Sequence, residues 1–93
     1  MTTQITNLQS PRSGNPVANQ FMISTDKYNI FKSYQTIIAK QNRNTNKITL
    51  DKNSWDYSAT TLKYLKVFLG TNKSKKELKE DIKQGIYKLS NLN

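Results

Sequence analysis

The sequence contains no cysteine and no histidine, and these two absences remove the chemistry of several protein classes. Without cysteine there is no disulfide framework, no thiolate nucleophile and no thiolate zinc site. Without histidine, the commonest general base and the usual imidazole metal ligand are also missing. We therefore expect a binding protein and not an enzyme, with no metal and no cofactor.

Glycine and acidic residues are scarce as well. The three glycines are too scattered for a P-loop or a dinucleotide-binding fingerprint: Gly14, Gly70 and Gly85. Of the six carboxylates, Glu77, Glu80 and Asp81 have the i, i+3, i+4 spacing of one helix face, which indicates a solvated, charge-balancing surface. Asp51 and Asp56 flank a predicted turn and have too few partners nearby for a two-metal site.

Long hydrophobic runs are also absent. Hydrophobic residues make up 34% of the 93 residues, so the expected core is thin. No run approaches the length of a membrane span or of a signal-peptide core. We therefore expect one small cytoplasmic domain with no membrane association.

Lysine is what the chain has in excess. Thirteen lysines and two arginines face six acidic residues, which gives a net charge of +9, and the whole excess lies in residues 27–93. Such a charge favours polyanions and speeds encounter with them. Base reading prefers the arginine fork, so sequence-specific DNA recognition is not the expectation. The alternative is that the lysine content reflects only the base composition of the gene.

Alternating hydrophobicity predicts an antiparallel β-meander of about three to four strands. The expected strands cover residues 18–25, 28–34, 36–40 and 47–50, with a turn at Asp26–Lys27. Residues 1–9 show little pattern and are expected to form a flexible N-terminal arm.

The segment SPRSGNP, residues 10–16, carries two prolines and a glycine. These residues fix unusual backbone angles, while Ser13 and Asn15 can bond their own backbone. We expect a structured loop against the sheet edge, with Arg12 near the surface. Slack linker is the alternative.

The period then changes to that of helices. In residues 54–70 the apolar positions have helical spacing, Ser58 is a candidate N-cap and Gly70 a candidate helix end. Residues 74–85 begin with the capping-box pattern Ser74-x-x-Glu77. Residues 86–89 predict a closing strand. The expected fold is a single small α+β domain over residues 10–93, with a meander, two helices and a C-terminal strand.

The second predicted helix is the first candidate site. Its Lys76, Lys79 and Lys83 share one strip, while Leu78 and Ile82 form the docking strip. Lysines of the first helix and the loop extend this basic surface, and Arg12 and Tyr34 complete the candidate partner-binding or nucleic-acid-binding set: Lys63, Lys66, Lys73, Lys75, Lys76, Lys79, Lys83, Arg12 and Tyr34. The alternative is an ordinary solvated helix.

Aromatic residues give a second candidate, because rings beside lysines can stack on single-stranded nucleic acid. In a domain this small we expect Trp55, Phe31 and Phe68 to belong to the core instead. Tyr34, which follows Lys32 at the same strand parity, is the aromatic residue most available for stacking.

Three segments together resemble a family of small proteins of phages and mobile elements in low-GC Gram-positive bacteria: SPRSGNPVANQF, FKSYQTIIA and WDYSATTLKYLKVFLG. The resemblance extends from Ser10 to Asn93 and includes the G-x-Y of Gly85 and Tyr87. It implies a phage accessory protein in the cytosol of a host cell. Such short non-enzymatic proteins are often inhibitors of host defence.

Two functions follow as hypotheses. The first is a stoichiometric inhibitor of a host defence protein or nucleoprotein, of the anti-CRISPR or anti-restriction type, that acts through the lysine-rich surface. The second is a nucleic-acid-binding accessory protein of phage replication or transcription. A minor third function, sequestration of an anionic signal nucleotide, would need a pocket lined by Arg12, Arg43 or lysines.

Overall fold

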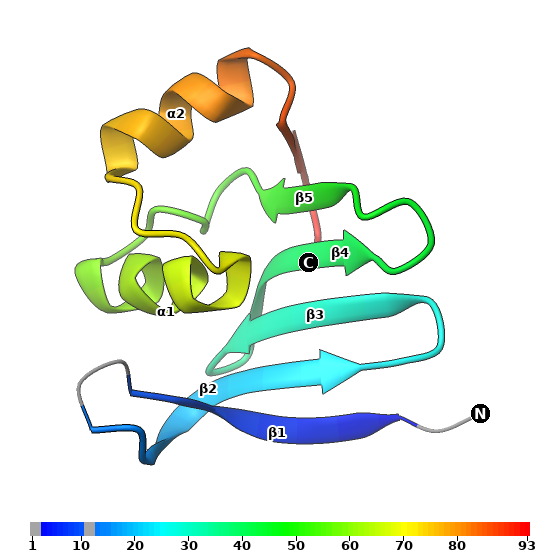
Figure 1. Ribbon diagram of the computed structural model, residues 1–93, viewed down its shortest axis with the longest axis vertical. Coiled ribbons are helices and arrows are strands. Elements are labelled where there is room, and N and C mark those ends of the chain that lie inside the picture. The colour runs from blue at the N-terminus through cyan, green and yellow to red at the C-terminus, as the bar shows by residue number, and fades with distance from the viewer. Residues whose placement is uncertain (1–2, 11–12) are drawn as a thin grey trace.

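The computed structural model describes residues 3–10 and 13–93, which form one six-stranded sheet with two helices on one of its faces (Figure 1). The strands lie in sequence order across the sheet: β1 (Gln4–Gln9), β2 (Pro16–Ser24), β3 (Tyr28–Ser33), β4 (Thr36–Asn42), β5 (Ile48–Asp51) and β6 (Tyr87–Ser90). The helices α1 (Ala59–Leu69) and α2 (Lys75–Lys83) lie between β5 and β6 in the chain. All neighbouring strands are antiparallel except β5 and β6, whose parallel pairing requires the crossover that the two helices provide.

The α+β class and the two helices are confirmed, but the number of strands was underestimated. Residues 4–9, expected as part of a flexible arm, form the edge strand β1, in which Ile5 pairs with Ile23 of β2. The hydrophobic pattern of residues 4–9 shows little sign of a strand because Leu8 is the only residue that β1 buries. Five strands form the meander, and β6 adds a sixth.

The loop at residues 10–16 closes the hairpin between β1 and β2, so its described part is structured, as expected. The Ser10 N–H donates to the Asn15 carbonyl at 2.9 Å, and the Gly14 N–H donates to the Ser10 carbonyl at 2.8 Å. Gly14 has a φ of 73°, which favours glycine because a side chain would be strained there. Pro11 and Arg12 lie outside the described residues.

Both helices begin with the predicted capping groups, and α1 also ends at the predicted Gly70. The Ser58 side chain accepts from the Thr61 N–H at 3.0 Å, and Gly70 ends α1 with a φ of 69°. At α2 the capping box is complete, because Ser74 Oγ accepts from the Glu77 N–H at 3.2 Å and Glu77 Oε1 accepts from the Ser74 N–H at 3.1 Å. These bonds satisfy N–H groups that a helix start otherwise leaves without partners.

The core lies between the sheet and the helices. Phe31 on β3 and Leu50 on β5 are fully buried beneath Leu65 of α1 and Leu78 of α2. The Phe31 ring stacks on Phe68 with 5.9 Å between centroids. The expected core positions of Trp55 and Phe31 are thereby confirmed, and Phe68 packs against the core while partly exposed: the buried apolar set is Leu8, Phe31, Ile38, Ala39, Leu50, Trp55, Tyr64, Leu65 and Leu78.

A buried carboxylate ties the C-terminal residues to the sheet. Asp51, at the end of β5, is 1% exposed and accepts from the Leu92 N–H at 2.9 Å. Burial alone would raise the pKa of the Asp51 carboxyl, but hydrogen bonds from Leu92, Ser54, Asn93 and Asn53 outweigh burial and hold the pKa below its ordinary value of 3.8. The Asn93 side chain in turn bonds the Ile37 N–H at 2.8 Å and the Ile37 carbonyl at 3.0 Å.

Candidate lysine-rich binding surface

The strip formed by Lys76, Lys79 and Lys83 faces solvent on α2, while Leu78 is fully buried and Ile82 packs partly exposed against the core. This confirms the predicted docking strip of the helix. Among the described residues, carboxylates form ion pairs with Lys73 and Lys75 and with no lysine of this strip. The three ammonium groups are therefore available to a partner.

The carboxylates of α2 serve the fold. Glu77 belongs to the capping box, and Asp81, expected on the solvated face, is 8% exposed and bonds Lys73 at 2.6 Å. The expectation for Asp81 was wrong because helical spacing alone does not show what lies beside the helix. The hydrogen bond to Asp81 raises the pKa of the Lys73 ammonium above its ordinary value of 10.5.

Two of the predicted site lysines are thereby occupied within the protein. Lys73 bonds Asp81, and Lys75 lies 3.6 Å from Asp56, which belongs to the segment preceding α1. Both pairs fasten α2 or the loop before it. We therefore remove Lys73 and Lys75 from the set that is free to bind a partner.

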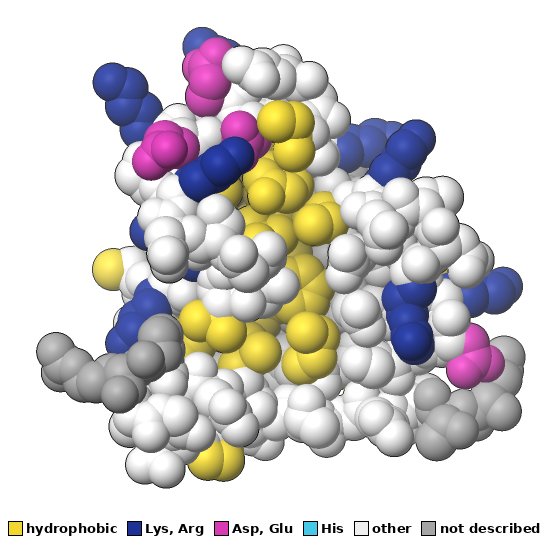
Figure 2. Space-filling view, in the orientation of Figure 1, with side chains coloured by type: hydrophobic (Ala, Val, Ile, Leu, Met, Phe, Trp, Pro, Cys, Tyr) yellow, Lys and Arg dark blue, Asp and Glu magenta, His cyan; other side chains and the backbone are white. Residues whose placement is uncertain are grey.

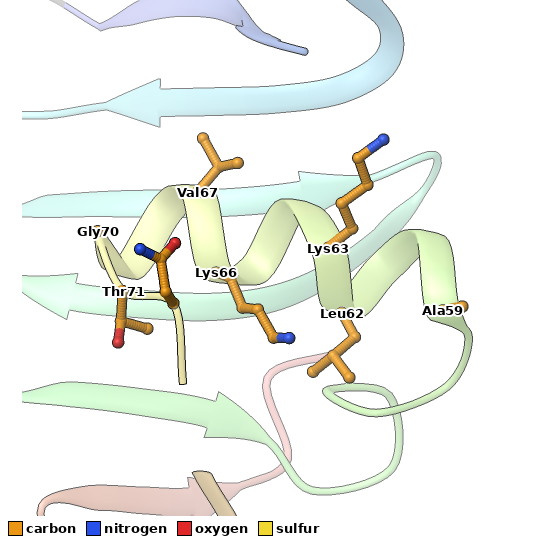
Figure 3. Close-up of a pocket in the computed structure, with 8 residues that line it drawn as sticks. Ala59, Leu62, Lys63, Lys66, Val67, Gly70 and Thr71 are labelled. Atoms are coloured by element: carbon orange, nitrogen blue, oxygen red, sulfur yellow. The ribbon is translucent and has the colours of Figure 1, made fainter. Parts of the chain in front are cut away.

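Lys63 and Lys66 lie on α1, a helix that carries no acidic residue. They border a shallow hollow of about 550 Å³ together with Leu62 and Val67 (Figure 3). Figure 3 shows Lys63 and Val67 projecting to one side of the helix, and Lys66 and Leu62 to the other. The two ammonium groups therefore diverge, which suits an extended anionic surface better than a single small anion.

Tyr34 lies in the turn after β3 and is 61% exposed, with a φ of 55°. We expected Tyr34 to share a strand face with Lys32, and this was wrong because β3 ends at Ser33. Its N–H donates to the Asn19 carbonyl at 2.7 Å, which holds the turn. Arg12, the ninth predicted site residue, lies outside the described residues.

Sequence reasoning missed Tyr57 as an available ring. Tyr57 is 80% exposed and lines, with Tyr34 and Ser58, a hollow of about 570 Å³. Its position beside buried Trp55 suggested a cluster at the first helix, but no pattern indicated which ring faces outward. The two tyrosines come together because the turn after β3 reaches the start of α1.

Charge is spread around the molecule and does not form one compact patch. Figure 2 shows lysine and arginine side chains around the rim of the helix-bearing face, with a band of hydrophobic side chains down its middle. Arg43 is engaged with the fold, because its guanidinium donates to the Thr25 carbonyl at 2.6 Å. Within residues 3–10 and 13–93, no group of three or more acidic side chains is arranged to hold a metal ion, and no helix is long and apolar enough to cross a membrane.

The chain belongs to a protein family of unknown function (DUF8033), whose model matches residues 3–85. The matched region contains strands β1 to β5, both helices and all seven predicted site lysines. No curated protein and no solved structure shows significant similarity to the chain.

Proposed function

We propose that the protein is a non-catalytic binding protein that engages an acidic or polyanionic partner through the free lysines of its two helices. In its concrete form the proposal is a phage accessory protein that inhibits a host defence nucleoprotein, such as a CRISPR effector or a restriction enzyme. It would occupy the partner's nucleic-acid channel or an acidic surface beside it, in the cytosol of the host.

The main support for this proposal is that the carboxylates of α2 have partners within the fold while three of its lysines do not. Glu77 and Asp81 are used in the capping box and in the bond to Lys73, whereas Lys76, Lys79 and Lys83 have no carboxylate partner among the described residues. Exposed lysines that form no ion pair within the fold can attract an anionic partner and bind it. Lys63 and Lys66 of α1, whose ammonium groups diverge, are further candidate contacts for the same partner.

The test is charge reversal with a matched control. The α2 variant carries Lys76→Glu, Lys79→Glu and Lys83→Glu. The control carries Lys27→Glu, Lys47→Glu and Lys52→Glu, three exposed lysines outside the helices that also lack carboxylate partners in the described chain. Both variants have the same net charge, so any difference between them reports position and not total charge.

We expect the α2 variant to lose inhibition of DNA cleavage by the defence enzyme and to lose protection of phage in a plaque assay, while the control retains both. Each surface change should alter the free energy of unfolding by only about 0.5 kcal/mol. A folded α2 variant that inhibits as well as the control would refute the α2 surface. Failure of the unmodified protein to inhibit any CRISPR or restriction system of its host would refute the inhibitor role itself.

Direct nucleic-acid binding is the second candidate, and the shared hollow of Tyr34 and Tyr57 favours it. Both rings are largely exposed, and exposed aromatic rings can stack on unpaired bases. Binding of mixed-sequence single-stranded DNA should then weaken steeply as salt rises, and Tyr34→Ala with Tyr57→Ala should weaken it at every salt concentration. Negligible affinity at low salt would exclude this candidate.

A further inference from the structure

We call the face of the sheet that points away from the helices the open face. It carries more apolar side chains than a solvated face of an antiparallel sheet normally does. Side chains alternate along each strand, so the neighbours of core residues point to this face. Ile30, for example, precedes buried Phe31 on β3. The apolar members of the open face are Ile5, Phe21, Ile23, Tyr28, Ile30 and Ile37.

No described helix or strand covers the open face, and only at one corner do Leu92 and Asn93, among the described residues, bond Asp51 and Ile37. Both helices contribute to the core on the other face, through Leu65 and Leu78. On the open face Ile5 is 64% exposed, and Ile23 and Ile30 are half-buried. A solvated face of an antiparallel sheet is normally polar, and a contiguous apolar patch on a small protein marks an interaction site.

Lysines occupy the other half of the same face. The strand register places six residues in one row across the sheet: Ile5, Ile23, Ile30, Lys40, Thr49 and Lys88. The row is therefore apolar over β1 to β3 and basic over β4 to β6. Lys32 adds a third cation, and the acidic residue that points to this side, Asp51, is buried and bonded to Leu92.

We propose that the open face is a docking site for an acidic amphipathic α-helix of a partner protein. Charge complementarity requires acidic groups against Lys40 and Lys88, because in the described part of the chain no carboxylate pairs with either lysine. The apolar half requires aliphatic or aromatic side chains from the same partner. This surface lies across the sheet from α2, so the proposal does not depend on the lysines of α2.

The chemistry of the face favours a protein helix over a nucleic acid. Four of its six apolar residues are isoleucines, which give a nucleobase no ring to stack on, and the Phe21 ring is half-buried. The Tyr28 ring is already covered on one side by Lys40, whose Nζ lies 3.9 Å from the ring centroid. A second copy of the chain is disfavoured because each copy would bring Lys32, Lys40 and Lys88 to a shared interface without a carboxylate.

The dimensions also fit. Five spacings of about 4.8 Å separate the outer strands, so the row is about 24 Å long, the length of a helix of about 16 residues. At its basic end Tyr28, Lys40 and Lys88 border a hollow of about 890 Å³ that reaches the edge strand β6. This hollow can hold the acidic end of the partner helix, while the apolar side of that helix covers Ile23 and Ile30.

The test uses a designed helical peptide of about 18 residues with leucine on one face and glutamate on the other. A shuffled peptide of the same composition, without the amphipathic pattern, is the peptide control. Amide chemical shifts of the protein map where each probe binds. The protein variants are Lys40→Glu with Lys88→Glu on the open face, and, as a charge-matched control, Lys27→Glu with Lys52→Glu at two exposed lysines outside the row and outside both helices.

We expect saturable shifts along β1 to β6, an affinity at least about tenfold lower for the open-face variant and for the shuffled peptide, and unchanged affinity for the control variant. The variant spectra must remain folded, and Ile30→Thr, which keeps every charge, should also weaken binding several-fold. Absence of peptide shifts on this face would overturn the proposal. So would tighter binding there by an oligothymidylate of about 15 nucleotides, or concentration-dependent shifts of the protein alone.

Discussion

The two faces of the sheet differ most clearly at two adjacent residues of β3. Phe31 is fully buried on the helix-covered face and stacks on Phe68, whereas Ile30 is half-buried on the open face between Ile23 and Lys40. The same strand therefore contributes to the core with one residue and to an uncovered surface with the next. We infer that residues of the covered face contribute most of the free energy of unfolding. Residues of the open face can therefore serve binding without a large loss of stability.

Charges differ between the two sides in the same way. On the helix side Asp81 and Asp56 each pair with a lysine. On the open face Lys32, Lys40 and Lys88 have no carboxylate partner within the described residues. Internal ion pairs fasten the helices to the rest of the fold, whereas the lysines of the open face form none within the described residues, and Lys40 lies over the Tyr28 ring instead.

The largest expected effect comes from the covered face. Phe31→Ala removes a fully buried ring and its stack on Phe68, and the helices above cannot collapse fully into the space. We expect the free energy of unfolding to fall by about 3–5 kcal/mol. Urea denaturation followed by tryptophan fluorescence measures this loss, because Trp55 belongs to the same core. A loss below about 1 kcal/mol would mean that the two faces contribute alike.

Substitution of Asp51 is expected to have the next largest effect, because the Asp51 carboxylate bonds the C-terminal Leu92 to the end of β5. Asp51→Asn leaves one acceptor oxygen in place of two, so some donors among Leu92, Ser54 and Asn93 lose their partner. We expect a loss of about 1–3 kcal/mol near neutral pH. The matched control is Asp26→Asn, at an exposed aspartate of the turn after β2, which should change the free energy of unfolding by less than about 0.5 kcal/mol.

The pH dependence of this contribution has a definite sign. The folded-state pKa of Asp51 lies below its unfolded value near 3.8. The contribution is therefore fully present above pH 3.8 and is lost as the pH falls through the folded-state pKa. Urea midpoints measured from pH 7 down to pH 2 should fall less for Asp51→Asn than for the unmodified protein. Equal slopes would show that other carboxylates dominate the acid response.

Local patterns predicted much of the fold. The i, i+3 hydroxyl–carboxylate spacing of Ser74 and Glu77 gave the start of α2, and Gly70 gave the end of α1, because capping depends on neighbouring residues alone. Alternating hydrophobicity predicted the meander from β2 to β5, because this pattern also depends only on residues that are close in the sequence. The edge strand β1 was missed because an edge strand with one buried residue leaves almost no hydrophobic period.

The candidate site was harder to predict, because contacts between segments that are distant in the sequence decide which of its side chains are paired and which are free. Exposure of Lys76, Lys79 and Lys83 follows from helical spacing and was correctly expected. The pairing of Lys75 with Asp56 joins two segments whose proximity is set only by the tertiary fold, and no spacing rule reports it. Likewise, the row that places Ile30 beside Lys40 depends on strand register, which the sequence did not specify.

A smaller effect is expected where α2 begins. Ser74→Ala removes the Oγ that accepts from the Glu77 N–H and leaves this N–H without its cap. We expect a loss of about 1 kcal/mol, measured as a shift of the urea midpoint. Ser74→Asn is the matched control and should restore most of the loss, because asparagine is also a good N-cap. Equal losses for both variants would show that packing of α2, and not its cap, sets the effect.

The smallest effect is expected on the open face, where Ile30→Thr tests the comparison directly. Threonine keeps the β-branched shape that suits a strand, and Ile30 touches no helix that would leave a cavity behind. We expect a loss below about 1 kcal/mol, several-fold less than for the adjacent Phe31→Ala. The same denaturation experiment measures both variants, and comparison of their urea midpoints avoids the extrapolation to zero denaturant. If Ile30→Thr cost as much as Phe31→Ala, the open face would be part of the stabilising core, and its apolar residues would need no partner to explain them. A small cost would leave isoleucines that the fold does not require, set in a row with lysines that it does not pair, and a binding partner is the physical reason to keep both.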